Sequence, residues 1–447
     1  MRHYIYLLLS FFVFSCMDDS NVDMQGGPID KELQTLLVET APNGNIEDYI
    51  LPDSDDFNAI PQDPLNPITA EKVQLGKLLF HETGIAQNPK NEEGRGTFSC
   101  ASCHHAQGGF QAERFQGIGD GGLGFGLGIA RDKHNLYKEE DLDVQPIRTP
   151  SAMNIAYQIN VLWNGQFGAT GLNNGTEAAW TADTPKETNH LGFEGTETQA
   201  IAGLDVHRLV IDENLMASLG YKEMFDRVFA DMPQSERYSA ITAGLAIAAF
   251  ERTILANEAP FQKWLKGDMQ AMTTKQKEGA ILFFDKGECA SCHNGPSLAN
   301  MEFHALGMLD LIDCPDPVFK TTLDNVENLG RGGFTGRAED NYRFKVPQLY
   351  NLKDSPFYGH GSSFYSVLDV LIYKNEAQKE NSRVPENALS PLFHPLNLTD
   401  QELEAITAFI EGGLYDSNLG RYVPAELPSG NCFPNADLLS QQELGCL

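Results

Sequence analysis

Apolar residues recur at helical spacing at two equivalent places in the chain. Val73, Leu75 and Leu79 mark one helix, and Ile281 and Phe284 mark another. Each helix is followed by a loop and then by the same five letters, CASCH. The first loop, residues 82–97, is the longer of the two. The pattern therefore predicts one helical unit that is used twice.

Further stretches extend this helical pattern to most of the chain. Residues 238–265 form a long amphipathic stretch that predicts one helix closing the first unit. Residues 399–413 predict the last helix of the second unit, with an Asp cap and a Gly stop. The chain of 447 residues is too long for one core, so two domains are expected. We predict an all-α protein with long loops.

The N-terminus predicts export from the cytoplasm. Its apolar run, residues 4–14, is too short to span a membrane, so residues 1–15 are interpreted as a signal peptide. The letters before Cys16 resemble a lipobox, which predicts a lipid on Cys16 as the sole membrane attachment. A plain cleaved signal is the alternative. Both place the protein in the cell envelope, on the periplasmic side or at the surface.

Charge and composition narrow the choice of partners. The net charge is −30, so the chain lacks the basic surface that nucleic acid requires. Residues 16–65 are acidic and rich in proline and are expected to form mostly a linker. An acidic surface suits a basic partner protein.

Two pairs of cysteines are each followed directly by a histidine. Such a pair could form a disulfide, a redox dithiol, half a zinc site or a covalent haem anchor. In CxxCH, both thiols can attach a haem while the adjoining imidazole reaches its iron. Two identical copies in an exported chain favour two covalently bound haem c groups. The motifs are Cys100-Cys103-His104 and Cys289-Cys292-His293.

Three cysteines remain outside these motifs and Cys16. Cys432 and Cys446 lie in a tail rich in proline and glycine, and an exported protein permits a disulfide between them. Free thiols are the alternative, and Cys314 would then stay free in either case.

Several sequence blocks between residues 66 and 420 resemble the bacterial di-haem cytochrome c peroxidases, a family that includes MauG-type enzymes. The blocks are LGKLLF with the first CASCH, RTPSAMN, LWNGQF, ETQAIAG, AFERTI, the second CASCH and KVPQLYNLKDSPFYGHGS. The resemblance implies two class I cytochrome c-like domains. These are a peroxidatic haem domain, 66–266, and an electron-transfer haem domain, 267–420, followed by a tail, 421–447. Family members are often homodimers.

The resemblance also implies roles for individual residues. His104 would ligate the peroxidatic haem iron, and His293 would ligate the iron of the electron-transfer haem. Trp163 matches a tryptophan that lies between the haems, where an indole can conduct electrons; an ordinary buried aromatic is the alternative. Gln199 matches a glutamine of the distal pocket.

The chain departs from the family where a glutamate usually moves the peroxide proton. Asp205 and His207 are the candidates here, and the ordinary pKa of imidazole favours His207 as the general base. Arg208 could stabilise the developing hydroxide. The alternative is a surface His-Arg pair.

The iron ligands opposite the two proximal histidines also differ. A histidine that blocks the first haem in many relatives is replaced by Asp120, which predicts an open or water-bound first iron. At the second haem, counting from the glycine of the family's turn gives Tyr373, where peroxidases have methionine and MauG-type enzymes have tyrosine. Met308 and His360 are the alternatives. Tyrosine would favour the MauG-like chemistry.

Calcium between the domains is doubtful, because Arg148 occupies the position of a calcium-binding asparagine. An ion pair of Arg148 with Asp354 is expected in its place.

We therefore expect a peroxidase that reduces hydrogen peroxide to water with electrons from a small cytochrome or similar redox donor. A MauG-like oxidation of a partner protein is the first alternative. A non-catalytic di-haem electron carrier is the second.

Overall fold

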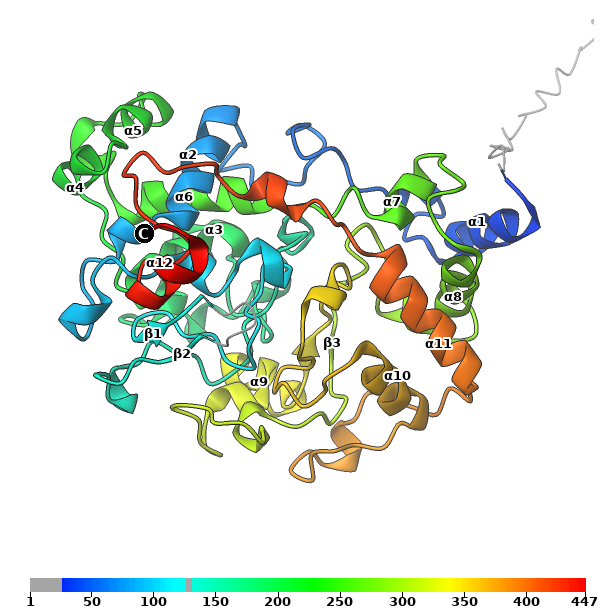
Figure 1. Ribbon diagram of the computed structural model, residues 1–447. Helices are drawn as coiled ribbons and strands as arrows, with labels where there is room; N and C mark the ends of the chain where they lie inside the picture. Colours follow the sequence, from blue (N-terminus) through cyan, green and yellow to red (C-terminus); the bar gives the residue numbers. More distant parts are fainter. Residues whose placement is uncertain (1–25, 126–130) are drawn as a thin grey trace, which may run out of the picture.

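The computed structural model describes residues 26–125 and 131–447, and this part of the chain is rich in helix (Figure 1). Its strands form only two antiparallel pairs, β1 (Gly122–Leu123) with β2 (Asp132–Lys133) and β3 (Phe303–His304) with β4 (Phe344–Lys345). None of the helices in these ranges is long and apolar enough to cross a membrane. The predicted signal peptide and Cys16 lie outside the described residues. The helices are α1 (Pro28–Thr40), α2 (Ala70–His81), α3 (Gly195–Val206), α4 (Glu213–Ser218), α5 (Lys222–Val228), α6 (Ala240–Arg252), α7 (Pro260–Leu265), α8 (Thr274–Phe284), α9 (Arg331–Thr335), α10 (Val367–Glu376), α11 (Asp400–Ala408) and α12 (Leu438–Leu444).

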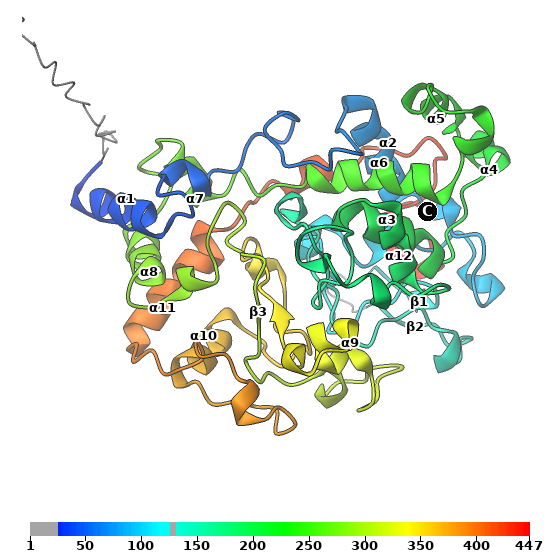
Figure 2. The same cartoon turned by 180° about the vertical axis from the view of Figure 1, so that it is seen from behind.

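The helices form two groups that lie side by side in both views (Figures 1 and 2). In the first group α2 crosses α6 at Gly76, where a Cβ atom would lie 1.8 Å from the carbonyl oxygen of Ala246. In the second, α8 crosses α11 at Gly279, where a Cβ would lie 1.9 Å from the carbonyl oxygen of Ala405. Only glycine permits such close crossings. The two units predicted from the pattern thus have the same kind of helix crossing, in which a glycine of one helix packs against a backbone carbonyl of the other.

The expected long helix over 238–265 is wrong, because the structure has two helices there. α6 ends at Arg252, and α7 begins at Pro260. Proline has no N–H to donate to the preceding turn, so it can open a helix but not continue one. The expected Asp cap at 399–413 is also corrected: Thr399 caps α11, accepting from the Glu402 N–H at 3.3 Å.

The linker expected over 16–65 is likewise wrong for its described part. α1 packs against α8, and Leu33 and Leu37 are fully buried. The buried carboxylate of Asp30 lies 2.6 Å from the Lys277 amine and accepts from the Trp264 indole at 2.8 Å. The proline and acidic content of this region suggested a linker, but both residue types also suit the start of a helix. Pro28 is the first residue of α1, and Asp30 lies in its first turn.

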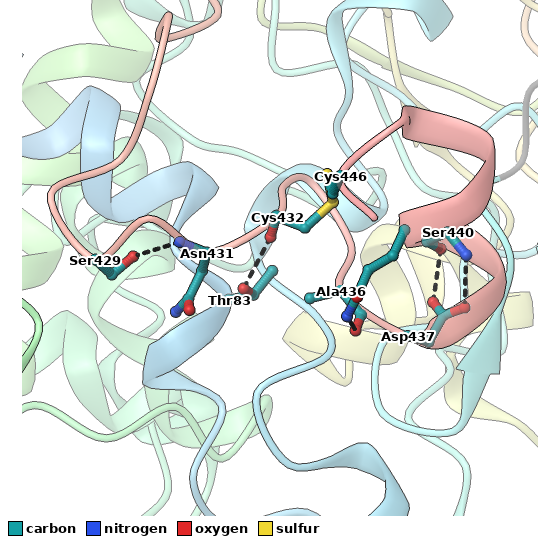
Figure 3. The surroundings of a disulfide bond; sticks show 9 residues. Thr83, Ser429, Asn431, Cys432, Ala436, Asp437, Ser440 and Cys446 are labelled. Atoms are coloured by element: carbon teal, nitrogen blue, oxygen red, sulfur yellow. Dashed lines mark hydrogen bonds between the residues drawn. A yellow bond between two sulfur atoms is a disulfide. The ribbon is translucent and has the colours of Figure 1, made fainter.

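The C-terminal tail returns to the first helix group and packs beside the first cysteine motif. Cys432 and Cys446 form the disulfide that the sequence permitted, and Cys314 is free (Figure 3). Asp437, which caps α12, forms an ion pair of 3.0 Å with Arg131, and both side chains are buried. The hydroxyl of Ser99, directly before the motif, donates to the Pro434 carbonyl at 2.8 Å.

Removing the disulfide should loosen this tail. The two cysteines are separated by 14 residues, and closing a loop of that size stabilises a folded protein by about 3 kcal/mol. We expect the Cys432→Ser/Cys446→Ser variant to release α12 in limited proteolysis and to melt at a lower temperature. A Cys314→Ser variant is the control. Unchanged proteolysis of the double variant would show that the non-covalent contacts, Arg131–Asp437 and Ser99–Pro434 among them, hold the tail without the disulfide.

Candidate functional site

The histidines of the two motifs are held in the same way. His104 Nδ1 lies 3.0 Å from the carbonyl oxygen of Phe110, and His293 Nδ1 lies 2.9 Å from that of Leu298. Both acceptor residues have a positive φ, 56° and 48°, which is unusual for bulky side chains. Since a carbonyl only accepts, each Nδ1 carries a proton and each Nε2 keeps its lone pair for a metal.

The electrostatic surroundings support this ligand form. Burial lowers the pKa of both imidazoles to about 4, so they are neutral at ordinary pH. Burial raises the pKa of the Cys100, Cys103 and Cys289 thiols to about 12, and all four cysteines of the motifs are free. Paired free thiols beside a neutral imidazole fit covalent haem attachment.

One cavity of about 310 Å³ connects the two motifs. His104 and His293 both line it, as do Trp163 and Gln199, and most of its other walls are apolar. The structure therefore brings together the two expected iron ligands, the expected linking indole and the expected distal glutamine. No spacing in the sequence predicted that they share a single cavity.

Both the backbone and the indole of Trp163 form hydrogen bonds, one to each of the two motif blocks that contain Arg148 and Lys345. Its Nε1 donates to the Arg148 carbonyl at 2.8 Å, and its carbonyl accepts from the Lys345 N–H at 2.7 Å. The ring also lies edge-on to His360, with 6.3 Å between centroids. Arg148 and Lys345 belong to different motif blocks, so the indole lies where the two units meet.

Two buried cations line the cavity at equivalent positions of RTPSAMN and KVPQLYN. The two blocks also share an asparagine in the left-handed region, Asn154 at φ 54° and Asn351 at φ 55°. Arg148 donates to Gln111 and Ser355, and Lys345 donates to Gln158, all uncharged groups. Burial lowers the pKa of Arg148 to about 10 and that of Lys345 to about 7.

These cations test whether the cavity fits haem. No carboxylate pairs with either cation within the residues that the structure describes, and Arg148 Nε has no partner there. A buried charge without a counter-ion is costly, so the cavity suits a bound group that carries carboxylates, as haem does. The expected ion pair of Arg148 with Asp354 is wrong: Asp354 accepts from the Asn351 amide at 3.0 Å instead.

Glu251 is a cavity residue whose role the sequence analysis missed. It lies near the end of α6, in AFERTI, and lines the same cavity as His104. Burial, together with the neighbouring charge of Glu197, raises its pKa to about 8, and its Oε2 has no hydrogen-bond partner among the described residues. The sequence did contain a sign of this residue, because Glu251 directly follows an apolar helical run.

His207 and Arg208 lie at the end of α3 and do not line the cavity. His207 Nδ1 lies 2.7 Å from the buried carboxylate of Asp143, while the imidazole side chain is 36% exposed. Burial would lower the pKa of His207, but the Asp143 carboxylate outweighs this and raises it. Its charge also acts on His104, so the two imidazoles are electrostatic neighbours. Asp205, the other candidate, is exposed.

Arg208, which was expected to stabilise a developing hydroxide, is already paired with a carboxylate. Its guanidinium pairs with Asp120 at 2.8 Å, and Asp120 also accepts from the Lys90 N–H at 2.7 Å and from the Tyr137 hydroxyl. Asp120 occupies the position where the resemblance places a blocking histidine, and its carboxylate is bound by Arg208, Lys90 and Tyr137. His105 is buried and accepts from the Gly108 N–H at 3.1 Å.

The expected sixth ligand of the second haem, Tyr373, is not among the cavity residues. Its hydroxyl donates to the Leu306 carbonyl at 2.5 Å, and its ring packs against Phe364 and Phe393. Both alternatives, Met308 and His360, do line the cavity. The structure thus places the two alternatives on the cavity wall and Tyr373 next to one of its residues, Leu306.

Comparisons with known proteins agree with this geometry. The sequence profile for di-haem cytochrome c peroxidase matches residues 70–270. The chain is 28% identical over 359 residues to the methylamine utilization protein MauG of Methylorubrum extorquens, covering 79% of this chain and 81% of that protein. It is 27% identical over 297 residues to the cytochrome c551 peroxidase of Nitrosomonas europaea, covering 66% and 70%.

A solved structure has the same fold. The crystal structure of a MauG-like protein associated with microbial copper homeostasis matches 83% of this chain and 95% of its own, with a TM-score of 0.56 at 23% identity.

The sequence comparisons and the fold together make this chain similar to oxidoreductases of the di-haem peroxidase type. The resemblance noted in the motif blocks is confirmed: the chain is a homologue of the bacterial di-haem cytochrome c peroxidases, the family that includes MauG.

Proposed function

We propose that this protein reduces hydrogen peroxide to water with electrons from a small redox donor such as a cytochrome c. The observation that carries the proposal is the single cavity that joins His104 and His293, with Trp163 on its wall. A di-haem electron carrier would share the cavity but would need no buried proton carrier on its wall, such as Glu251. The names of the relatives, cytochrome c peroxidases among them, support the same reading.

The residues of the cavity, together with Cys100 and Cys103 next to His104, would hold two covalent haem c groups. When bound, these groups supply redox-active iron, one to react with peroxide and one to receive and pass electrons. Cys100 and Cys103 would anchor the first and Cys289 and Cys292 the second, while Arg148 and Lys345 would pair with their carboxylates. Trp163 would link the two groups through its indole.

His207 lies outside the cavity wall but acts electrostatically on His104, and from there it would move the proton of the peroxide. Its contact with Asp143 fixes Nδ1 as the donor and leaves Nε2 to accept a proton, which is the arrangement of a catalytic His-Asp pair. Gln199 would orient the peroxide from the cavity wall. Arg208 would act only indirectly, through Asp120. Glu251 is a second candidate for the proton, because it lines the cavity and its pKa lies near neutrality.

The architecture and location follow as parts of this proposal. The two helix groups would be two cytochrome c-like domains, 66–266 and 267–420. The protein would act on the periplasmic side of the envelope or at the surface, held by a lipid on Cys16, and its acidic surface would receive a basic donor protein. A homodimer is the expected assembly.

A MauG-like oxidation of a partner protein is the second candidate function. It is favoured by the similarity to MauG, which extends over 79% of this chain. The argument from Tyr373 is weaker in the structure, because its hydroxyl donates to the Leu306 carbonyl and Tyr373 itself does not line the cavity. This alternative predicts slow turnover with a reduced cytochrome and oxidation of aromatic side chains in an added protein.

Rapid mixing with peroxide tests the proposed function. Fully oxidised protein carrying two haems should change its haem absorption promptly after one equivalent of hydrogen peroxide, because no histidine occupies the blocking position, where Asp120 is held by Arg208. A reduced small cytochrome should then restore the resting spectrum. An unchanged spectrum at full haem content would contradict the open first iron and favour an electron carrier.

A further inference from the structure

One face of α10 is directed toward the second haem motif. Among the described residues, α10 contributes to the cavity wall only Val367, Val370, Leu371 and Lys374. Their spacing of i, i+3, i+4 and i+7 is that of one helical face. Tyr373 is turned by about 100° from Lys374 on the helix, which explains its bond to Leu306. The count of residues from Gly361 gives Tyr373, whereas the side chain that lines the cavity belongs to the next residue, Lys374.

Lys374 carries the only ionisable group on this face. Its amine makes no hydrogen bond or ion pair with any residue in ranges 26–125 and 131–447, and its one ring contact is with Phe393, at 5.3 Å from the centroid. The charge of the amine acts on His293 and on the thiols of Cys289 and Cys292. The amine thus lies close to the second motif, inside a cavity, without a polar partner.

The other cavity residues that could ligate this iron, His304, His360 and Met308, need no further partner. His304 Nδ1 lies 3.0 Å from the Ser390 hydroxyl, and its Nε2 lies 3.0 Å from the Glu302 carboxylate. His360 Nε2 lies 3.1 Å from the Asp310 carboxylate, and its ring is stacked on Phe344 at 3.6 Å. Met308 has a thioether that is satisfied by apolar surroundings. An amine in a cavity is different, because it costs free energy until a lone-pair acceptor or a counter-ion is supplied.

We propose that the Lys374 amine is the sixth ligand of the haem iron bound by His293. This inference rests on the two-haem content of the proposed function. On binding, the ammonium group releases one proton to solvent and the nitrogen lone pair forms the bond to iron, with no electron transferred. An amine is a harder donor than a thioether and favours ferric over ferrous iron. The second haem would then have a lower potential than a methionine-ligated one.

Spectroscopy of the resting ferric protein tests the ligand without using peroxide. In Lys374→Met, we expect the long-wavelength charge-transfer absorption of a sulfur–iron bond and an altered low-spin electron paramagnetic resonance signal. In Lys374→Ala, we expect loss of that low-spin signal. Tyr373→Phe, the neighbouring residue on α10, is the matched control and should leave both spectra unchanged. Two haems per chain, measured by the pyridine haemochrome method, would show that each variant has assembled.

Two results would overturn the proposal. If Lys374→Ala keeps the low-spin signal, the amine is not a ligand, and a change in potential alone would show that it pairs with a haem carboxylate. If Met308→Leu instead removes the signal, the thioether is the ligand. The peroxide response of the first haem, measured separately on wild-type protein, keeps a failure of this ligand distinct from a failure of the proposed function.

Discussion

Replacing His207 with alanine should slow the reaction with peroxide by about 10²- to 10⁴-fold, the usual contribution of a positioned proton carrier. The variant loses the imidazole that Asp143 holds at 2.7 Å. Stopped-flow absorption of the fully oxidised protein over a range of peroxide concentrations gives the second-order rate constant. We expect the haem spectra of the resting variant to stay unchanged.

The pH dependence of this rate gives an independent readout. A base must be neutral to accept a proton, and Asp143 raises the pKa of His207 above its ordinary value of 6.5. The rate should therefore begin to fall at a higher pH than for an unpaired imidazole as the solution is acidified. Asp143→Asn removes the carboxylate charge, so it should move this inflection to lower pH.

His134→Ala is the matched control: His134 also lies outside the cavity wall, but its Nδ1 accepts from the Leu136 N–H at 3.2 Å and not from a partner of the His104 site. An unchanged rate in His207→Ala would contradict the role of this residue. Glu251→Gln would then be the decisive variant, since Glu251 is a cavity acid whose pKa burial raises to about 8.

Replacing Arg252 with methionine should lower the free energy of unfolding by about 3–5 kcal/mol, the cost of breaking a buried ion pair. Arg252 and Glu197 are both fully buried, with 2.6 Å between guanidinium and carboxylate, and Glu194 lies 2.9 Å from the same nitrogen. The pair joins α6 to α3, the helix that carries Gln199. Without Arg252, the Glu197 carboxylate would remain buried with a single amide donor, from Asn66 at 3.2 Å.

Denaturant unfolding of the holoprotein measures this effect. The double variant Glu197→Leu/Arg252→Met is the control, since replacing both charges by apolar side chains removes the uncompensated charge and should regain most of the loss. Arg95→Met, in an exposed pair with Glu92, should change the stability by less than about 1 kcal/mol. A loss of similar size in the single and double variants would show that packing, not charge, dominates at Arg252.

The sequence by itself determined the two cysteine–histidine motifs and the duplicated helical unit that precedes them. CxxCH is a local motif, so its two thiols and its histidine are adjacent in any fold, and helices α2 and α8 followed from local apolar spacing. The free or bridged state of Cys432 and Cys446 was left open by the sequence. Their pairing depended on how the tail folds back on the first helix group.

Only the tertiary structure decided which distant side chains meet. The direction of a side chain changes by about 100° per residue along a helix, so two neighbours on α10 differ: Lys374 lines the cavity and Tyr373 does not. Arg148 and Lys345 share a cavity because the two units pack together, and Asp143 reaches His207 across 64 residues of chain. Such contacts depend on packing between distant segments, which no local pattern of residues encodes.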